Sequence, residues 1–362
     1  MPLHLHWFLP LHGDGREVAK RSSGVAVEGA RREPALDYVT QVALAAERFG
    51  FTGMLTPFGL FCEDPWIMAS ALAGRTSTVQ FMIALRPGFI SPLLAAQMAA
   101  TFQRVSGNRL LFNIVTGGDA DEQRRYGDWL EHDQRYQRTG EFLDVFLRAW
   151  PGERFDFTGE HFTIRAGLLA RPHPVRPRVF LGGSSAAARR VAAEHADVFL
   201  TWGEPPKATA EHIALAREAA APHGRELSFG TRFHVISRDT SAQAWRVARQ
   251  LVDGMDPARI AQAQQRFRNT ESEGQRRMAA LHGGSTDSLE VYPNLWAGYG
   301  LVRPGVGTAL VGSYEEVAER IEEYHALGID HLILSAQPHL EEAYNFGEGV
   351  MPLLRKRGLL AD

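Results

Sequence analysis

Short apolar runs alternate with amphipathic segments along most of the chain. Apolar runs bounded by Gly, Pro and polar residues are typical of buried strands, whereas apolar positions three and four residues apart predict helices. One such helix is predicted to begin at Pro34 and to end at Gly50. The predicted strands cover residues 4–11, 53–58, 79–85, 109–116, 178–181, 197–202, 229–236 and 331–335, and residues 155–164 are predicted to form a small surface hairpin.

Eight strands separated by helices indicate a parallel sheet with helical crossovers. This order favours an α/β fold of the (β/α)8 TIM barrel type, with residues 1–362 forming one domain; an open doubly wound sheet is the alternative. Residues 240–312, between the last two predicted strands, are too long for one crossover and contain further helical runs. Because barrel active sites lie at the carboxyl ends of the strands, we predict that this insertion includes a mobile lid over the site.

Residues 293–303 and the Gly-rich run that follows them to residue 312 are the most distinctive part of the insertion. Their glycines, with Pro293 and Pro304, argue against a regular helix or strand, so we expect this stretch to contribute little to the core. A plain linker does not need the Trp296, Tyr299 and Arg303 side chains that it carries. The pattern fits a loop that brings Arg303 onto an anionic substrate.

The composition is that of an ordinary soluble enzyme, with 44% hydrophobic and 22% charged residues. The formal net charge of −3 gives no general attraction to nucleic acid or to a membrane surface. The single cysteine, Cys62, excludes an internal disulfide framework and a cysteine-based zinc site, and the scattered histidines match no metal motif. Without a membrane-spanning run or a leader pattern, we predict a cytoplasmic protein with no metal, nucleic-acid or membrane partner.

A Gly-Gly-Ser-Ser sequence joins the strand at 178–181 to the next helix. Gly183 lets the backbone approach a ligand, while Ser184 and Ser185 leave the free N–H groups of a helix N-terminus for an anion. A simple capped turn explains the sequence equally well, but the late loops of a barrel characteristically hold a cofactor phosphate. The sequence is neither a dinucleotide-binding Gly motif nor a Walker A motif.

Other polar residues fall at the ends of predicted strands. Asn113 ends its strand, and His132 and Tyr136 open the helix that follows, where they could meet the same cofactor. Arg232 and His234 lie on one face of their strand by alternation, and an Arg and a His are costly to bury without an anionic partner. Trp202 closes another strand and is expected to face the pocket mouth, although a core position is the alternative.

Several stretches, taken together in one order, resemble the flavin-dependent alkanesulfonate monooxygenases of the bacterial luciferase-like group. The resemblance also includes the Pro338-His339-Leu340-Glu341-Glu342 sequence near the C-terminus. The other matching stretches are residues 7–10, 12–15, 62–64, 84–87, 112–113, 115–117, 181–185, 200–206, 276–282 and 294–303.

This resemblance implies a (β/α)8 barrel that uses reduced FMN as a diffusible co-substrate together with O2. It also implies cleavage of the C–S bond of an organosulfonate to an aldehyde and sulfite, a separate NAD(P)H-dependent flavin reductase as partner, and a homodimer or homotetramer. By the same resemblance Cys62 is the active-site cysteine, Arg232 and His234 are the Arg-x-His pair, and Arg303 is the lid arginine. We expect the arginines to bind the sulfonate and His234 to manage a proton.

The sequence departs from the family at Gln337, where the family usually has a tyrosine assigned to the active site. An amide cannot act as a general acid, but it donates and accepts hydrogen bonds. Together with His339 and Trp202, Gln337 favours a hydroxylated sulfonate such as sulfoquinovose; a simple alkanesulfonate or methanesulfonate is the alternative. An F420- or flavin-dependent oxidoreductase that transfers hydride, and a barrel that only binds flavin or anions, are the alternatives from other classes. A second departure is the basic first loop at 20–33.

Overall fold

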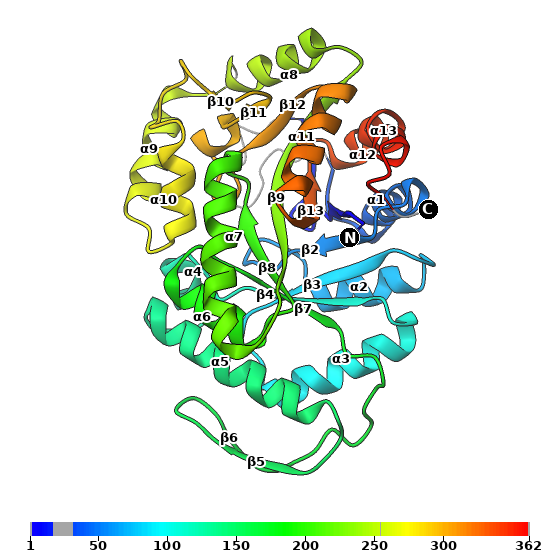
Figure 1. The fold of residues 1–362 in the computed structure, drawn as a ribbon, viewed down its shortest axis with the longest axis vertical. Helices are drawn as coiled ribbons and strands as arrows, with labels where there is room; N and C mark the ends of the chain where they lie inside the picture. Colours follow the sequence, from blue (N-terminus) through cyan, green and yellow to red (C-terminus); the bar gives the residue numbers. More distant parts are fainter. Residues whose placement is uncertain (1, 17–31, 254, 361–362) are drawn as a thin grey trace.

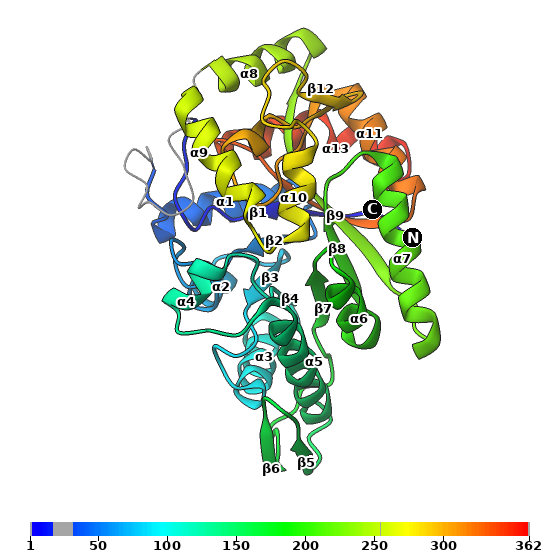
Figure 2. The ribbon, with the colours of Figure 1, turned by 90° about the vertical axis from the view of Figure 1, so that its left-hand side faces the viewer.

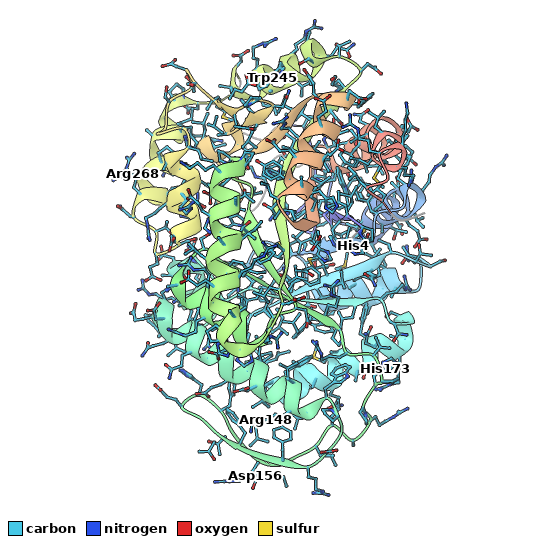
Figure 3. All side chains as sticks on the ribbon, viewed as in Figure 1. His4, Arg148, Asp156, His173, Trp245 and Arg268 are labelled. Carbon is cyan, nitrogen blue, oxygen red and sulfur yellow. The ribbon has the colours of Figure 1, made fainter. Side chains whose placement is uncertain are left out.

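The computed structural model describes residues 2–16, 32–253 and 255–360 of the 362-residue chain. Most of the distinctive stretch at 20–33 therefore lies outside the described residues. The described part is elongated in the view of Figure 1, where the β5–β6 hairpin and helix α8 lie at opposite ends. Figure 3 shows the same separation through the side chains of Asp156 in β5 and Trp245 in α8.

Eight parallel strands close into a barrel, as the sequence predicted, and not into an open doubly wound sheet (Figure 1). Each strand pairs in parallel with the next one around the barrel, and the ring is closed by pairing of β8 with β9, of β9 with β13 and of β13 with β1. The barrel strands are β1 (His4–Phe8), β2 (Gly53–Thr56), β3 (Gln80–Leu85), β4 (Leu110–Ile114), β7 (Arg178–Gly182), β8 (Val198–Trp202), β9 (Ser228–Arg238) and β13 (Ile329–Ser335).

Helices between the strands cover the outside of the barrel, and their ends follow local sequence rules. Asp64 accepts a hydrogen bond from the Ile67 backbone N–H, with Pro65 in the first turn. Gly50 ends α1 in a left-handed conformation at φ 85°. The covering helices are α1 (Leu36–Phe49), α2 (Pro65–Ala73), α3 (Pro92–Ser106), α5 (His132–Ala149), α6 (Ala186–His195), α7 (Pro206–Ala220), α11 (Tyr314–Ala326) and α12 (His339–Gly349).

Shorter elements complete the fold. The predicted surface hairpin is present as β5 (Phe155–Thr158) and β6 (Thr163–Gly167). The remaining short helices are α4 (Ala120–Arg125), the 3-10 turn η1 (Ala221–His223) and α13 (Met351–Lys356). Within the described residues, no helix is long and apolar enough to cross a membrane, and no group of three or more His, Cys, Asp or Glu side chains is placed to hold a metal ion.

The interior of the barrel is filled by side chains. At its amino end, His6 Nε2 lies 3.1 Å from His331 Nδ1. Burial, followed by His4 and Arg178, lowers the pKa of His6 to about 3. Above these rings lies an apolar layer, so ligand-binding groups must come from the carboxyl ends of the strands. The layer consists of Phe8, Leu55, Met82, Leu111, Phe180, Val198, Leu200 and Ile333.

The insertion between β9 and β13 contains helices and a small strand extension. Its elements are α8 (Ser241–Asp253), α9 (Pro257–Arg268), α10 (Glu273–Ala280), β10 (Glu290–Tyr292), β11 (Leu295–Trp296), η2 (Gly298–Leu301) and β12 (Ala309–Ser313). The last of these, β12, pairs in parallel with the second half of β9, from His234 to Arg238. Figure 2 shows α9 and α10 on the same side of the molecule as α4, and Thr270 Oγ1 bonds there to the Gly118 carbonyl at 3.3 Å.

The prediction for the Gly-rich stretch was wrong in two respects. Ala309–Ser313 is a regular strand, and Trp296, Tyr299 and Leu301 are almost fully buried in a second apolar cluster. The glycines serve close packing of the backbone: the Gly300 N–H donates to the Gly307 carbonyl at 3.0 Å, and a Cβ at Gly307 would lie 2.7 Å from the Gly300 Cα. Most of this stretch is thus part of the packed fold.

Candidate active site

Arg232 and His234 point into the carboxyl end of the barrel from β9. Phe233, on the opposite face, packs against Tyr324 with ring centroids 4.8 Å apart. The Arg232 guanidinium lies 4.6 Å from the ring centroid of Phe8, a member of the interior apolar layer. The alternation predicted for this strand is therefore confirmed.

No carboxylate among the described residues neutralises the charge of Arg232. Among the residues that the structure describes, Arg232 forms no ion pair, and its buried Nε has no hydrogen-bond partner. Burial, and then the nearby charge of Arg303, lower its pKa to about 9. Two guanidinium groups therefore act on one another across a largely desolvated space. This arrangement suits an anion, which both groups would stabilise.

His234 is held in a fixed orientation beside these arginines. Its Nδ1 lies 2.9 Å from Ser335 Oγ, and its ring stacks on Tyr299 of η2 with centroids 4.1 Å apart. Burial, then Arg303, Arg232 and His339, lower the pKa of His234 well below the ordinary value. The imidazole is therefore neutral at physiological pH, which argues against a stored proton at this position.

His339 occupies a different electrostatic environment, against a buried carboxylate. Its backbone N–H donates to Asp14 Oδ2 at 2.7 Å, and its Nδ1 lies 3.0 Å from Asp14 Oδ1. Burial raises the pKa of Asp14, but His339 and the hydroxyl of Tyr38 outweigh burial, so the pKa is lowered overall. The His339 ring lies 5.5 Å from that of Phe8. Sequence reasoning gave Asp14 no role, although it lies in the matching stretch at 12–15.

Gln337 carries an amide that the fold leaves unsatisfied. Neither Nε2 nor Oε1 has a hydrogen-bond partner among the described residues, although both atoms are buried. The amide is therefore not bonded to His339 or to Trp202, the two neighbours that the sequence suggested. A buried amide without partners is costly, so these atoms are free to bind a ligand.

A cradle for an anionic group surrounds the start of α6. Ser185 caps the helix by accepting from the Ala188 N–H at 3.2 Å. A Cβ at Gly183 would lie 2.7 Å from the Tyr136 hydroxyl and 2.5 Å from the Ala188 Cβ, so the backbone approaches closely here. Burial raises the pKa of Tyr136, against hydrogen bonding from Ser185 and Thr116 that lowers it. The helix N-terminus, two serines and a phenol fit a phosphate.

Of the remaining predicted cofactor residues, His132 lies beside this cradle and Asn113 lies on β4, the strand that pairs with β7. The His132 ring is 5.0 Å from the Tyr136 ring, and its Nδ1 lies 2.6 Å from Asp133 Oδ1. Asn113 on β4 is two residues after the inward-facing Leu111, so it also faces the barrel interior.

Helix α10 of the insertion packs over Ser184 and Trp202. A Cβ at Gly274 would lie 3.3 Å from Ser184 Oγ and 3.2 Å from the Trp202 ring. Trp202 is thus packed beneath the insertion, close to the cradle.

Cys62 lies in the segment that joins β2 to α2. Burial, and then Glu122, raise the pKa of its thiol to about 12, while Arg86 opposes the change. The thiol therefore remains protonated near neutral pH. Arg86, a residue that sequence reasoning did not single out, is only 6% exposed and pairs with Glu122 at 2.5 Å. Phe58 covers its guanidinium at 5.1 Å.

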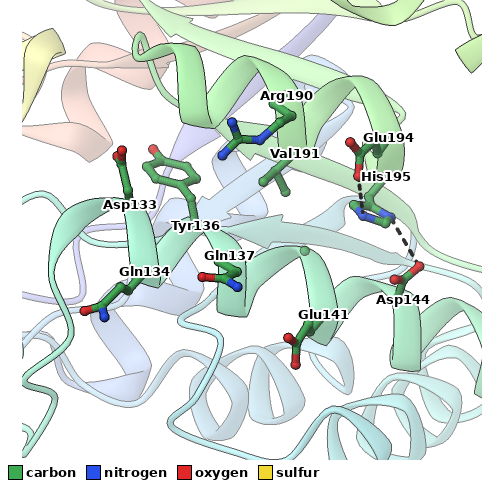
Figure 4. Close-up of a pocket in the computed structure, with 11 residues that line it drawn as sticks. Asp133, Gln134, Tyr136, Gln137, Glu141, Asp144, Arg190, Val191, Glu194 and His195 are labelled. Carbon is green, nitrogen blue, oxygen red and sulfur yellow. Dashed lines mark ion pairs between the residues drawn. The ribbon is translucent and has the colours of Figure 1, made fainter. Parts of the chain in front are cut away.

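A hollow on the described surface lies between α5 and α6 (Figure 4). It measures about 510 Å³ and borders the cradle through Tyr136. Its walls carry four acidic side chains, against one arginine and one histidine, and neither Arg232 nor Arg303 lines it; the six are Asp133, Glu141, Asp144, Glu194, Arg190 and His195. An acidic surface repels an anion, so the hollow is unsuited to an anionic substrate.

Comparison with known proteins places these features in a family. The sequence model of the luciferase-like monooxygenase family matches residues 3–331. A riboflavin lyase (RcaE) solved with modified FMN and riboflavin has a TM-score of 0.82 at 20% identity, over 100% of this chain and 93% of that one. EDTA monooxygenase (EmoA) from Chelativorans sp. BNC1 has a TM-score of 0.80 at 21% identity, over 100% of this chain and 95% of that one. DmoA from Hyphomicrobium sulfonivorans has a TM-score of 0.80 at 19% identity, over 100% of this chain and 90% of that one. The chain belongs to the luciferase-like monooxygenase family.

Proposed function

We propose that this protein is a two-component sulfonate monooxygenase that uses reduced FMN and O2. The overall reaction converts R-CH2-SO3⁻, O2 and FMNH2 into R-CHO, HSO3⁻, FMN and water. The observation that carries the proposal is the pair of arginines at the barrel mouth, with Arg232 lacking an ion pair among the described residues. A sulfonate stays ionised at every physiological pH, so fixed cations are the groups that bind it.

Arg232 and Arg303 would bind the sulfonate oxygens. Each guanidinium presents several N–H donors in one plane, which matches oxygens that belong to one group. A bound anion would also relieve the electrostatic cost that lowers the pKa of Arg232. His234 stacks on Tyr299, and Arg303 lies four residues further along the same stretch. We propose that substrate binding and the position of this stretch are coupled through Arg303.

The cradle at α6 fits the phosphate of FMN. Gly183, Ser184, Ser185 and Tyr136 would hold the phosphate, with His132 beside it and Asn113 directed toward the ring. When bound in its reduced form, FMN supplies the activation of O2, which is the chemistry of the cofactor. We expect a separate NAD(P)H-dependent reductase to supply it, in a cytoplasmic homodimer or homotetramer.

The insertion is the proposed lid, because exclusion of water protects the oxygen transfer from loss as peroxide. Its helix α10 and the segment before it contact the barrel through ion pairs as well as through packing. Arg277 forms a bidentate ion pair with Glu204 (Nη2 to Oε2 2.6 Å), and Glu271 pairs with Arg135 at 2.9 Å. In each pair the partner from the insertion is about one third exposed (34% for both Arg277 and Glu271), so we propose that these pairs open and reform as the lid moves.

The substrate we favour is a hydroxylated sulfonate, with sulfoquinovose as the leading candidate. The unsatisfied Gln337 amide offers one acceptor and two N–H donors for hydroxyl groups. A site that hydrogen-bonds hydroxyls rejects analogues without them more strongly than it rejects an extra methylene. A higher kcat/KM for sulfoquinovose than for hexanesulfonate, reversed in Gln337→Ala, is expected; a preference for the plain alkanesulfonate would assign Gln337 no part in substrate choice.

Sulfite release tests the proposed reaction. Sulfite is expected only when reduced FMN, O2 and an organosulfonate are all present, and not with oxidised FMN alone or under anaerobic conditions. Sulfite formed without O2 would contradict a monooxygenase. Substrate turnover with reduced F420 and no oxygen would instead indicate hydride transfer on the same barrel.

A further inference from the structure

His234 and His339, two of the imidazoles at the barrel mouth, differ in the charges that surround them. His234 faces Arg232 and Arg303, which oppose a second proton on its ring. Gln337 carries an amide, which has no ionisable group and cannot accept the proton. A reaction that must remove a proton from its substrate therefore needs another acceptor, and His339 is the imidazole that faces a carboxylate.

The contact with Asp14 fixes which nitrogen of His339 carries the hydrogen. An ionised carboxylate only accepts hydrogen bonds, so the hydrogen must lie on Nδ1, 3.0 Å from Asp14 Oδ1. The other nitrogen, Nε2, has no hydrogen-bond partner among the described residues. It is thus left as a lone-pair acceptor.

Asp14 is itself held rigidly, at 0% exposure. Its carboxylate accepts from the Gly15 N–H at 2.8 Å, from the His339 N–H at 2.7 Å and from the Tyr38 hydroxyl. The Asp14 backbone N–H donates to the Arg32 carbonyl at 2.9 Å, and the Arg32 N–H donates to the Asp14 carbonyl at 3.2 Å. A carboxylate with this many donors stays ionised and cannot rotate away, as a positioning group requires.

The ring of His339 lies next to the proposed sulfonate site. Its centroid is 5.5 Å from that of Phe8, and the Arg232 guanidinium lies 4.6 Å from the same Phe8 ring. A sulfonate on Arg232 therefore brings the carbon attached to sulfur into the neighbourhood of His339.

We propose that Asp14 is a positioning residue that presents Nε2 of His339 as the proton acceptor for the last step of the reaction. This inference rests on the proposed function. Insertion of one oxygen at the carbon attached to sulfur gives an α-hydroxysulfonate, R-CH(OH)-SO3⁻. In its collapse the O–H proton passes to Nε2, the O–H electron pair forms the C=O bond, and the C–S pair leaves with sulfite. The proton then returns to sulfite or water, and no oxidant or reductant is consumed.

This step is measured without flavin turnover, by following sulfite release from hydroxymethanesulfonate with oxidised FMN and without O2. The wild-type protein is expected to accelerate the release at least tenfold over buffer. Asp14→Asn and His339→Gln are each expected to lose that acceleration, and the double variant is expected to match His339→Gln within about twofold. His173→Gln, which replaces an imidazole that bonds the Val175 backbone in the loop before β7, serves as control and should stay within about threefold of wild type.

The nitrogen-15 signals of the His339 ring provide a readout that a merely structural role would not move. They are identified by their absence from His339→Gln, and should show hydrogen on Nδ1 and none on Nε2 in wild type. Asp14→Asn should give a mixture of the two forms. If Asp14→Asn does not fold, the wild-type spectrum, assigned with His339→Gln, still shows which ring nitrogen of His339 carries the hydrogen.

The outcomes separate this inference from the proposed function. Acceleration of hydroxymethanesulfonate collapse, with no organosulfonate oxidised by reduced FMN and O2, supports the inference and contradicts the function. Normal sulfonate turnover in Asp14→Asn, or hydrogen on Nε2 in wild type, overturns the inference and leaves the function standing. If Asp14→Asn also lowers the rate of sulfite release in the His339→Gln variant, the inference would be overturned.

Discussion

Arg232→Met is expected to make the protein more stable while it lowers sulfonate turnover at least tenfold. The charge of Arg232 lacks an ion pair among the described residues, and its pKa falls to about 9, mainly through burial. That value is roughly 3.5 below the ordinary one, which at about 1.4 kcal/mol per pKa unit is about 5 kcal/mol. Because the folded-state pKa is the lower one, this cost is present at all pH values below about 9 and declines as the pH rises further.

The net gain is smaller than that cost. Methionine keeps much of the volume but loses the cation–π contact with Phe8, worth about 1–2 kcal/mol. We therefore expect a gain of about 3–4 kcal/mol, with a rise in melting temperature of at least about 2 °C. An alkanesulfonate should raise the melting temperature of wild type and leave that of Arg232→Met unchanged.

Arg109→Met is the matched control, because Arg109 is a buried arginine whose hydrogen bonds are satisfied. Its side chain donates to the carbonyls of Ser106 and Ala73, both at 2.6 Å, and to Thr76 Oγ1 at 2.8 Å. Its removal leaves buried acceptors unpaired at about 1–3 kcal/mol each, so the melting temperature should fall. Differential scanning calorimetry of the three proteins decides the case. A fall in Arg232→Met as large as that in Arg109→Met would refute the reasoning.

Three further changes are expected to have defined effects. Arg303→Ala should lower kcat/KM by at least about 100-fold, as one of two charge-assisted sulfonate contacts is lost, and steady-state sulfite assays that give an unchanged value would remove it from the site. Cys62→Ser should keep activity within about threefold, because the raised thiol pKa leaves no thiolate near neutral pH; rapid alkylation of wild type by iodoacetamide at pH 7.5 would contradict this. His6→Phe should reduce acid sensitivity: the pKa of His6 is lowered to about 3 in the fold, so stability is lost as pH falls from about 6.5 toward 3. Urea midpoints of wild type and His6→Phe that decline equally over that range would show that His6 is not responsible.

The barrel could be predicted because its strands carry their signal locally. In β9, the alternation of Arg232, Phe233 and His234 set the inward and outward faces, and the structure has the same two faces. The cap at Asp64 and the left-handed end at Gly50 are likewise decided by residues within one turn.

The structure of the Gly-rich stretch could not be predicted, because glycines occur both in mobile loops and in tightly packed backbone. A mobile loop and a tightly packed backbone both require residues without a Cβ. The distinction lies in the contact between Gly300 and Gly307 and in the burial of Tyr299 against His234, which are tertiary facts.

The Asp14 and His339 pair could not be predicted for a related reason. The two residues are 325 positions apart, and neither has a neighbouring pattern that points to the other. Closure of the barrel between β1 and β13 brings them together. The raised pKa of Cys62 is also a consequence of burial, which the residues on either side of it do not determine.

The number of sulfite molecules formed per O2 consumed tests the central claim most directly. In a single turnover of reduced FMN with a saturating organosulfonate, the wild-type protein should release about one sulfite per O2. Arg232→Met should still consume O2 but return it as H2O2, with sulfite reduced at least tenfold. Equal sulfite yields from the two proteins would contradict the account, because they would show that the arginine at the barrel mouth does not bind the sulfonate.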